Sequence, residues 1–301
     1  MSARASSLFA AVSILWGIPY LLIKIGVDGG ITPVTLSWGR MVLGGAVLLV
    51  LAARSGALGQ LRGHWRGLLA YSVVELAIPF PLIATGERHI ASSLAAIVIA
   101  TVPLLVALLA LKVDRAEQVT GRRLAGLCVG LVGVALLVGV SATGSVTTLL
   151  SVGAVFLAAI GYAGGPLIFK RYLSDVDPRA SMGTTLALAA LILTPLAIID
   201  WPKHSPTTGA LSALVGLALL CSALAFVLMA KLIGEIGASR AVVITYVNPV
   251  IALILGVVFL SEHPGIGSIA GLALILVGSR MSTVRSKPAS PASPQLEEAM
   301  V

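Results

Sequence analysis

The sequence predicts an all-α integral membrane protein of ten transmembrane helices, arranged as two inverted repeats of five helices. First, 58% of the 301 residues are apolar, only 11% are charged, and the mean hydropathy is +1.05, whereas about a quarter of the residues of a soluble domain are charged. Second, apolar runs of about 20 residues, long enough to cross a hydrocarbon core of about 30 Å, follow one another along the chain. Third, the first half of the sequence resembles the second half.

The apolar runs give the expected spans in order, and short polar connections separate them. They cover residues 7–26, 33–53, 66–85, 91–111, 121–140, 149–170, 181–200, 209–231, 238–260 and 266–285. The alternating pattern of a transmembrane barrel is absent from them, so we expect helices, which satisfy their own backbone hydrogen bonds. The polar residues 286–301 are expected to form a disordered tail.

The basic residues are distributed unequally between the two sides of the membrane. With a cytoplasmic N-terminus, the outer side carries only Lys24, Arg88 and Lys203, Arg40 lies within a span, and the other 16 of the 20 Lys and Arg residues fall on the cytoplasmic side. This positive-inside bias predicts that both termini are cytoplasmic. The net charge of +8 therefore indicates topology and contact with anionic lipids, and it does not indicate a nucleic-acid partner.

An offset of about 146 residues aligns the two halves of the chain. It pairs Ile14 with Ile160, Trp16 with Tyr162, Leu21 with Leu167, Lys24 with Lys170 and Ser93 with Ser239, and "AGLCVGLVG" from Ala125 matches "AGLALILVG" from Ala270 at an offset of 145. Such a repeat indicates two copies of one unit. Because each copy holds five spans, the second must enter the membrane from the opposite side. We therefore expect one repeat in residues 1–145 and an inverted one in 146–285, as in secondary transporters.

Four motifs of the chain carry a family resemblance. They are the Trp16–Gly17 pair with Lys24, "ITPVTLSWGR" before and into span two, "ASSLAAIVIATVPLL" in span four, and "GASRAVVITYVNPVIALILG" followed by the acidic turn "LSEHPG". With these motifs, nearly the whole chain resembles the EamA transporters of the drug/metabolite transporter (DMT) superfamily. Tyr162 departs from a common tryptophan and Asn248 from a common glutamate. The resemblance implies a ten-helix exporter or exchanger of small metabolites, such as amino acids, in the cytoplasmic membrane.

Two prolines lie near the middle of spans four and nine. Pro103 and Pro249 each remove one helical hydrogen bond and free a carbonyl four residues earlier, at Ile99 and Thr245. In hydrocarbon such carbonyls need a partner or a cavity, and broken helices form many transporter binding sites. We therefore expect both segments, with Asn248, to line the substrate site. The alternative is a kink that only shapes helix packing.

Glu75 is an acid near the centre of span three. A charge at this depth costs roughly 2.5 to 3.5 kcal/mol on insertion scales, so Glu75 should face the bundle interior, with a partner or a water-filled cavity. We expect Glu75 to bind the cationic group of a substrate, a proton, or both in turn, which would make it the coupling residue. The alternative is a structural ion pair with Arg40 or Lys24.

Arg40 and Lys24 are the other charges near hydrocarbon. Arg40 lies about 10 Å inside span two, where it can hold a substrate carboxylate by a bidentate contact, reach the outer head groups or pair with Glu75. Lys24 is expected to extend its charged tip to the outer interface. Aromatic side chains suited to an amphipathic ligand form a further candidate set, namely Trp16, Tyr20, Tyr71, Tyr162 and Tyr246. Each of them alone is more often a packing residue.

Among the classes of function, a secondary transporter of small molecules is best supported. An enzyme is not expected, because the intramembrane ionisable residues are too few for an acid–base pair or a nucleophile with its base. The four histidines are scattered in or beside connections, so we expect no metal site and no cofactor. The alternative is a channel or a structural membrane protein without coupled transport, although a pore calls for rings of like groups.

Overall fold

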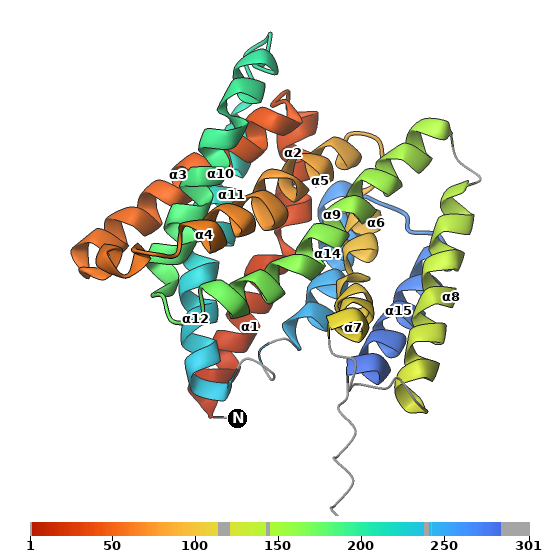
Figure 1. The fold of residues 1–301 in the computed structure, drawn as a ribbon. Helices are drawn as coiled ribbons and strands as arrows, with labels where there is room; N and C mark the ends of the chain where they lie inside the picture. Colours follow the sequence, from red (N-terminus) through yellow and green to blue (C-terminus); the bar gives the residue numbers. More distant parts are fainter. Residues whose placement is uncertain (1, 114–120, 143–144, 238–240, 242, 284–301) are drawn as a thin grey trace, which may run out of the picture.

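The computed structural model describes residues 2–113, 121–142, 145–237, 241 and 243–283. Throughout this part of the chain, the regular structure is helical. The α-helices are α1 (Ala3–Gly17), α2 (Pro19–Asp28), α3 (Pro33–Arg54), α4 (Trp65–Tyr71), α5 (Pro79–Glu87), α6 (Ser92–Ile99), α7 (Val102–Val113), α8 (Arg122–Ala142), α9 (Val146–Tyr172), α10 (Pro178–Ile199), α11 (Thr208–Ala218), α12 (Ala225–Ile236), α14 (Ile244–Leu260) and α15 (Ile266–Thr283) (Figure 1).

Six helical stretches are long and apolar enough to cross a membrane. They are Ala3–Asp28, Pro33–Arg54, Trp65–Glu87, Val146–Tyr172, Pro178–Ile199 and Thr208–Ile236. Four shorter apolar helices, Ser92–Val106, Leu124–Leu136, Ile244–Leu260 and Ile266–Met281, lie where the remaining spans were expected. The prediction of a helical, multi-pass membrane protein is therefore confirmed. The expected tail, 286–301, lies outside the described residues.

Several spans are interrupted, and prolines stand at most of the interruptions. The first bends at Ile18 before Pro19, and α6 ends at Ile99, with α7 starting one residue before Pro103. The expected break at Pro103 is thus present, whereas the expected break at Pro249 is wrong, because Pro249 lies within the continuous helix α14. Pro249 is in the second turn of this helix, so only a first-turn carbonyl loses its partner and the later turns continue.

Two π-helical turns lie at corresponding places in the third and eighth expected spans. The first, η2 (Ser72–Ala77), joins α4 to α5, and the second, η3 (Leu219–Leu224), joins α11 to α12. A π-turn places one extra residue in a helix and is frequently found at functional sites. The two turns therefore direct attention to the side chains that they carry, Glu75 and Ser222.

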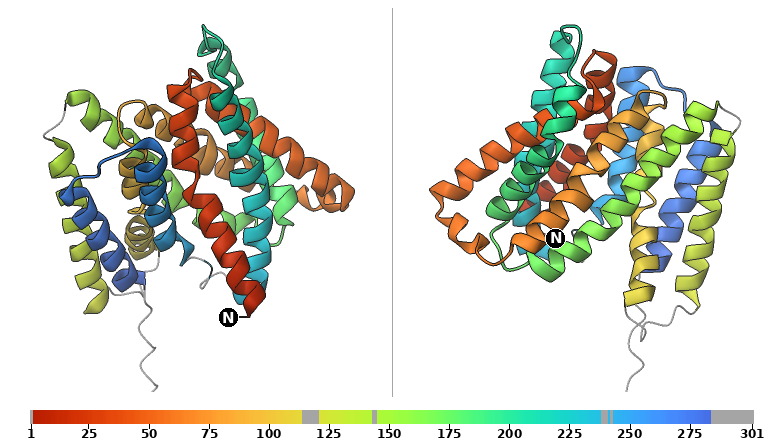
Figure 2. Two further views of the ribbon diagram at one scale, coloured as in Figure 1. Left: turned by 180° about the vertical axis from the view of Figure 1, so that it is seen from behind. Right: turned by 45° about the horizontal axis from the view of Figure 1, so that its top comes forward.

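The helices pack in pairs, each joining the first half of the chain to the second. Helix α3 packs on α10, α8 on α15, α6 on α14, α1 on α12 and α5 on α9. The pair of α8 and α15 lies at one end of the molecule (Figure 2). Its backbones approach closely: a Cβ added to Gly133 would lie 2.9 Å from the carbonyl oxygen of Gly271, and one added to Gly278 would lie 2.5 Å from that of Gly126. Small residues at such a crossing permit tight packing in the bilayer.

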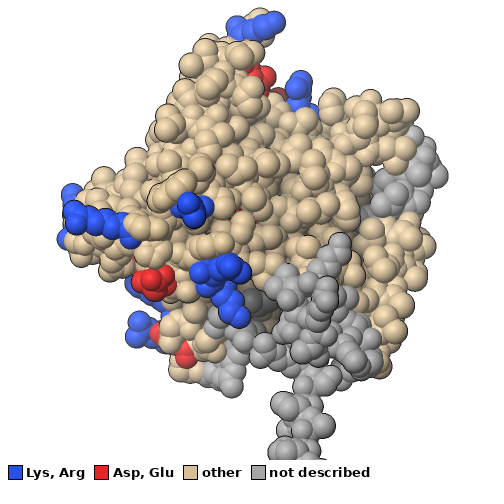
Figure 3. Space-filling model, in the orientation of Figure 1, with Lys and Arg blue, Asp and Glu red and all other residues tan. Residues whose placement is uncertain are grey.

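The ends of the helices show which parts of the chain share a side of the bundle. The start of α1 and the end of α15 lie at the lower end in Figure 1, whereas α9 starts at the upper end. On the face in Figure 3, most Lys and Arg side chains gather toward the lower left, and a largely uncharged surface separates them from the few at the upper edge. Three exposed arginines lie in this region: Arg54 ends α3, Arg62 is in the connection that follows, and Arg66 is at the start of α4.

Candidate functional site

Arg40 is a buried cation at the contact between the two halves. It extends from the middle of α3, and the residue is only 8% exposed. Its Nε donates a hydrogen bond of 2.8 Å to Oγ of Ser222 in η3, and its guanidinium carbon lies 4.2 Å from the centre of the Phe80 ring. Among the residues that the structure describes, no carboxylate lies within ion-pair distance of Arg40. The guanidinium therefore has an uncompensated positive charge with donors still available.

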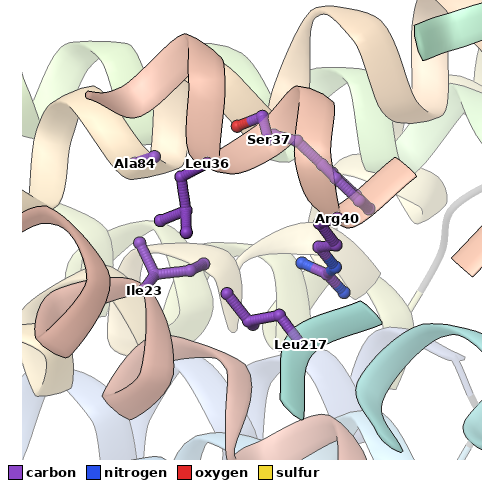
Figure 4. Close-up of a pocket in the computed structure, with 7 residues that line it drawn as sticks. Ile23, Leu36, Ser37, Arg40, Ala84 and Leu217 are labelled. Carbon is purple, nitrogen blue, oxygen red and sulfur yellow. The ribbon is translucent and has the colours of Figure 1, made fainter. Parts of the chain in front are cut away.

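A small cavity adjoins Arg40. It is lined by Ile23, Leu36, Ser37, Arg40, Phe80, Ala84 and Leu217, and it has room for about one water molecule. In the close-up, the Arg40 side chain extends from α3 toward the helix that carries Leu217 (Figure 4). In this conformation the cavity beside Arg40 is too small for a metabolite.

Two of the predicted aromatic residues lie near Arg40. The hydroxyl groups of Tyr20 and Tyr162 are within electrostatic range of the guanidinium, and the Tyr162 ring packs edge-on against Phe80, with 6.5 Å between ring centres. Tyr71 is electrostatically coupled to Tyr162 and to Glu75. The structure thus brings Tyr20 and Tyr162 near the buried charge, whereas Tyr71 interacts with Tyr162 and Glu75.

Trp16 and Tyr246 lie elsewhere. The Trp16 ring packs edge-on against Phe226 at 6.0 Å, while Tyr246 is in the first turn of α14 beside Thr245. With the amide of Asn248 oriented to suit its neighbours, it donates to the carbonyls of Ile244 (3.1 Å) and Ser13 (3.2 Å). Asn248 therefore ties α14 to α1.

The proline segments also lie apart from the small cavity. Ile99 is the last residue of α6, Pro103 is buried at the start of α7, and Pro249 is buried inside α14. Arg40 is the sole predicted site residue among those that line the cavity. The predicted residues thus do not all meet at one site: Tyr20 and Tyr162 lie near Arg40, whereas the proline segments lie along α6, α7 and α14.

Glu75 lies in η2 with its carboxyl group against α9. A Cβ added to Gly165 would lie 1.7 Å from Oε2 of Glu75, so this oxygen occupies space that exists because residue 165 is glycine. Oε2 is buried and accepts no hydrogen bond from any residue that the structure describes. The alternative of a structural ion pair with Arg40 or Lys24 is absent from this conformation.

Lys24 makes two contacts near the end of α2, and the expectation that its tip extends to the outer interface stays a prediction. Helix α2 continues to Asp28, two residues beyond the expected end of the first span. Lys24 Nζ lies 3.2 Å from Oδ1 of Asp28 and donates a hydrogen bond of 2.8 Å to the backbone carbonyl of Glu87. These two contacts join α2 to the end of α5.

Sequence reasoning missed two polar residues that bear on the site. Ser222 has an unremarkable sequence context, and only the packing of η3 against α3 places it on Arg40. Glu87 was assigned to a connection because the third span was expected to end at Thr85, but α5 continues through Glu87 and buries it completely.

The sequence profile of the EamA-like transporter family matches residues 4–139 and, a second time, residues 149–284. The chain belongs to the EamA-like transporter family. Related proteins include the uncharacterized inner membrane transporter YedA of Escherichia coli (strain K12), 28% identical over 82% of this chain and 79% of the relative. Another is a probable terminal-alkyne amino-acid exporter of Streptantibioticus cattleyicolor, 26% identical over 92% of this chain and 94% of the relative.

A protein of known crystal structure has the same fold. It superposes with a TM-score of 0.66 at 21% identity, over 94% of this chain and 97% of that protein. The transporter family and the apolar helices together identify a multi-pass membrane transporter, and they indicate a role that is not enzymatic.

Proposed function

We propose that this EamA-family protein is a secondary active transporter of small metabolites that carry a carboxylate, such as amino acids or related compounds. It acts as an exporter or exchanger by alternating access. The observation that carries this proposal is the Arg40 guanidinium, which is buried at the contact between the two halves and has no acidic partner in the described part of the chain. A buried cation of this kind costs several kcal/mol unless an anion compensates it. A substrate carboxylate would supply that anion, in the bidentate geometry that arginine favours.

Two further observations support the choice of substrate class. Tyr20 and Tyr162 add weakly polar aromatic surface beside the guanidinium, which suits an amphipathic ligand. The relative from Streptantibioticus cattleyicolor is named as a probable exporter of an amino acid. We therefore expect a substrate with one carboxylate and a small apolar or amphipathic body.

Alternating access requires two related halves, and paired contacts in the structure support such a relation. At an offset of 146, Trp16 aligns with Tyr162 and Phe80 aligns with Phe226. The contact of Trp16 with Phe226 is therefore equivalent to that of Tyr162 with Phe80. The family profile also matches once in each half. We propose inverted repeats at residues 1–145 and 146–285, with ten spans in total.

The proposed topology has both termini in the cytoplasm. Single-cysteine variants at Ser145 and Ser286, made after replacing Cys128 and Cys221, would test it with a membrane-impermeant thiol reagent. We expect labelling of intact cells at Ser145 alone. Labelling of both positions from one side would contradict the inverted arrangement.

Glu75 is the proposed coupling residue of the central site. Its unpartnered Oε2 lies against Gly165 in α9 and acts electrostatically on Tyr71 and Tyr162, so its charge can affect the aromatic side chains beside Arg40. We expect Glu75→Gln to retain exchange but to lose its response to a pH gradient. Unchanged transport with unchanged pH dependence would exclude a coupling role.

The proposed function is tested in two steps. Metabolites retained by cells with and without the protein are compared first, to identify a compound that accumulates in its absence. Purified protein in liposomes is then loaded with that unlabelled compound and supplied with a radiolabelled form outside. Counterflow, the transient accumulation of label against unlabelled compound, is expected of a carrier. Equilibration without accumulation would indicate a channel and would refute the proposal.

A further inference from the structure

A second polar region lies where α2, α5 and α14 end. It contains a cavity of about 340 Å³, which we call the vestibule; its lining is Lys24, Asp28, Arg88, His89, Ile90, Ala91, Leu260 and Glu262. In the proposed topology the vestibule opens to the outer solution. Its volume is ample for several water molecules, whose share of liquid volume is about 30 Å³ each. Protons from the outer solution can therefore reach the residues that line the vestibule.

Most of the acidic groups around the vestibule already have partners. Asp28 pairs with Lys24, and the two carboxylate oxygens of Glu262 accept hydrogen bonds of 2.7 and 2.9 Å from the backbone N–H groups of Ser92 and Ser93. These contacts account for the charge of both acids.

Glu87 is the exception. The residue is 0% exposed, and neither of its carboxyl oxygens has a hydrogen-bond partner among the residues that the structure places. Its position is fixed from two sides: Lys24 holds its backbone carbonyl, and a Cβ added to the preceding Gly86 would lie 2.5 Å from Val155 of α9. The end of α5 therefore cannot simply turn to hydrate the acid. A buried carboxylate with no partner is strongly unfavourable, so the group carries a proton or a bound cation in this conformation.

The charged and titratable groups that face Glu87 come from every side. Lys24 and Asp28 of α2 and Glu262 after α14 act on its carboxyl group electrostatically, and they belong to the vestibule. Arg88 and His89 follow it in the chain. Toward the centre of the bundle, the hydroxyl groups of Tyr20 and Tyr162 are within electrostatic range of both Glu87 and Arg40. Glu87 thus lies between the vestibule and the buried guanidinium.

We propose that Glu87 is a proton-binding site that exchanges with the outer solution through the vestibule. In the protonated state Glu87 is neutral and does not oppose an anionic ligand at Arg40. In the deprotonated state its negative charge acts on Tyr20 and Tyr162, which are within electrostatic range of Arg40, and disfavours that ligand. Proton binding from outside would then be linked to carboxylate binding at Arg40, and this linkage rests on the proposed function, whereas the proton site itself does not.

The proton site can be tested without a substrate. Dicyclohexylcarbodiimide reacts with protonated carboxyl groups in apolar surroundings, and the stable adduct is located by mass spectrometry of peptides. Intact cells that express the full chain are labelled over a series of outer pH values, and the protein is then purified and digested. We expect label on Glu87 that decreases about tenfold per pH unit above the midpoint of its titration.

Two controls sharpen the result. Everted membrane vesicles expose the opposite face to the buffer, and we expect the pH of that buffer to leave labelling of Glu87 unchanged. Glu75→Gln should retain the labelling and its pH response, whereas Glu87→Gln should lose the modified peptide. Absence of label on Glu87, or label that ignores the outer pH, would overturn the proposal. The proposed transporter function would remain, because counterflow tests it separately.

Discussion

Replacing Arg40 with leucine separates a binding role from a structural one. The hydrogen bond to Ser222 involves a charged donor and is worth about 1.5 to 3 kcal/mol, and the contact with Phe80 adds about 2 kcal/mol for a desolvated cation. The desolvation of a buried cation costs several kcal/mol, which is about as much as these two contacts contribute together. A leucine side chain would also regain about 1.5 to 3 kcal/mol by burial.

The partners of Arg40 tolerate its removal. Ser222 Oγ also donates a hydrogen bond of 3.0 Å to the carbonyl of Leu217, so Arg40→Leu leaves no hydroxyl unsatisfied. The position equivalent to Arg40 in the second half, at an offset of 146, is already a fully buried leucine, Leu186. We therefore expect the free energy of unfolding to change by no more than about 2 kcal/mol.

Arg40→Leu should reduce the affinity for substrate much more than it reduces stability. Loss of one partner of a buried charge pair costs about 2 to 5 kcal/mol, or at least a 30-fold loss of affinity for a carboxylate substrate. Unfolding in detergent gives the first quantity, and counterflow at graded substrate concentrations gives the second. Arg40→Lys is the matched control, because it keeps the charge and loses the planar fork. A leucine variant that loses more than about 4 kcal/mol of stability while its folded fraction transports normally would show that Arg40 is structural.

Three further substitutions have defined outcomes. Gly165→Ala would place a methyl group 1.7 Å from the present position of the Glu75 oxygen, so we expect an altered pH response of transport; Gly153→Ala in the same helix has open space and should change nothing. Burial raises the pKa of Glu262, but hydrogen bonds from the two serines that begin α6 outweigh it and hold the pKa below 4.5. The stabilisation from these hydrogen bonds is present above pH 4.5 and is lost as the pH falls through the lowered pKa of Glu262. Glu262→Ala should therefore reduce the free energy of unfolding by about 1 to 2 kcal/mol at pH 7 and by little in strong acid, as measured by thermal unfolding. Gly133→Ala would bring a methyl group within 2.9 Å of the α15 backbone, so we expect a loss of about 1 to 3 kcal/mol in the free energy of unfolding. An unchanged melting point would contradict the close crossing of α8 and α15.

Much of the fold was predictable because the bilayer imposes simple rules. A run of about 20 apolar residues must form a helix, and the observed helix bounds lie within a few residues of the expected ones at most ends. Pro103 was correctly expected to interrupt its span, because it lacks a backbone donor. These features depend on local chemistry that is visible in the sequence.

The missed features depend on contacts between distant segments. Each π-turn contains one residue more than the corresponding α-helical turn. The pattern of apolar residues in the sequence does not reveal this extra residue. Glu87 was missed because charged residues usually mark a connection, whereas here Lys24 and the packing of Gly86 on α9 keep the end of α5 buried. Ser222 became visible only through its contact with Arg40.

The matched π-turns bear on the ancestry of this protein. They begin at Ser72 and Leu219, and the same family profile describes both halves. An inserted residue that two diverging copies both retain is most simply inherited from a single ancestor. The widened turn would then be older than the gene fusion that joined the copies, and Arg40, which has only a leucine as its counterpart, would be a later acquisition of one copy.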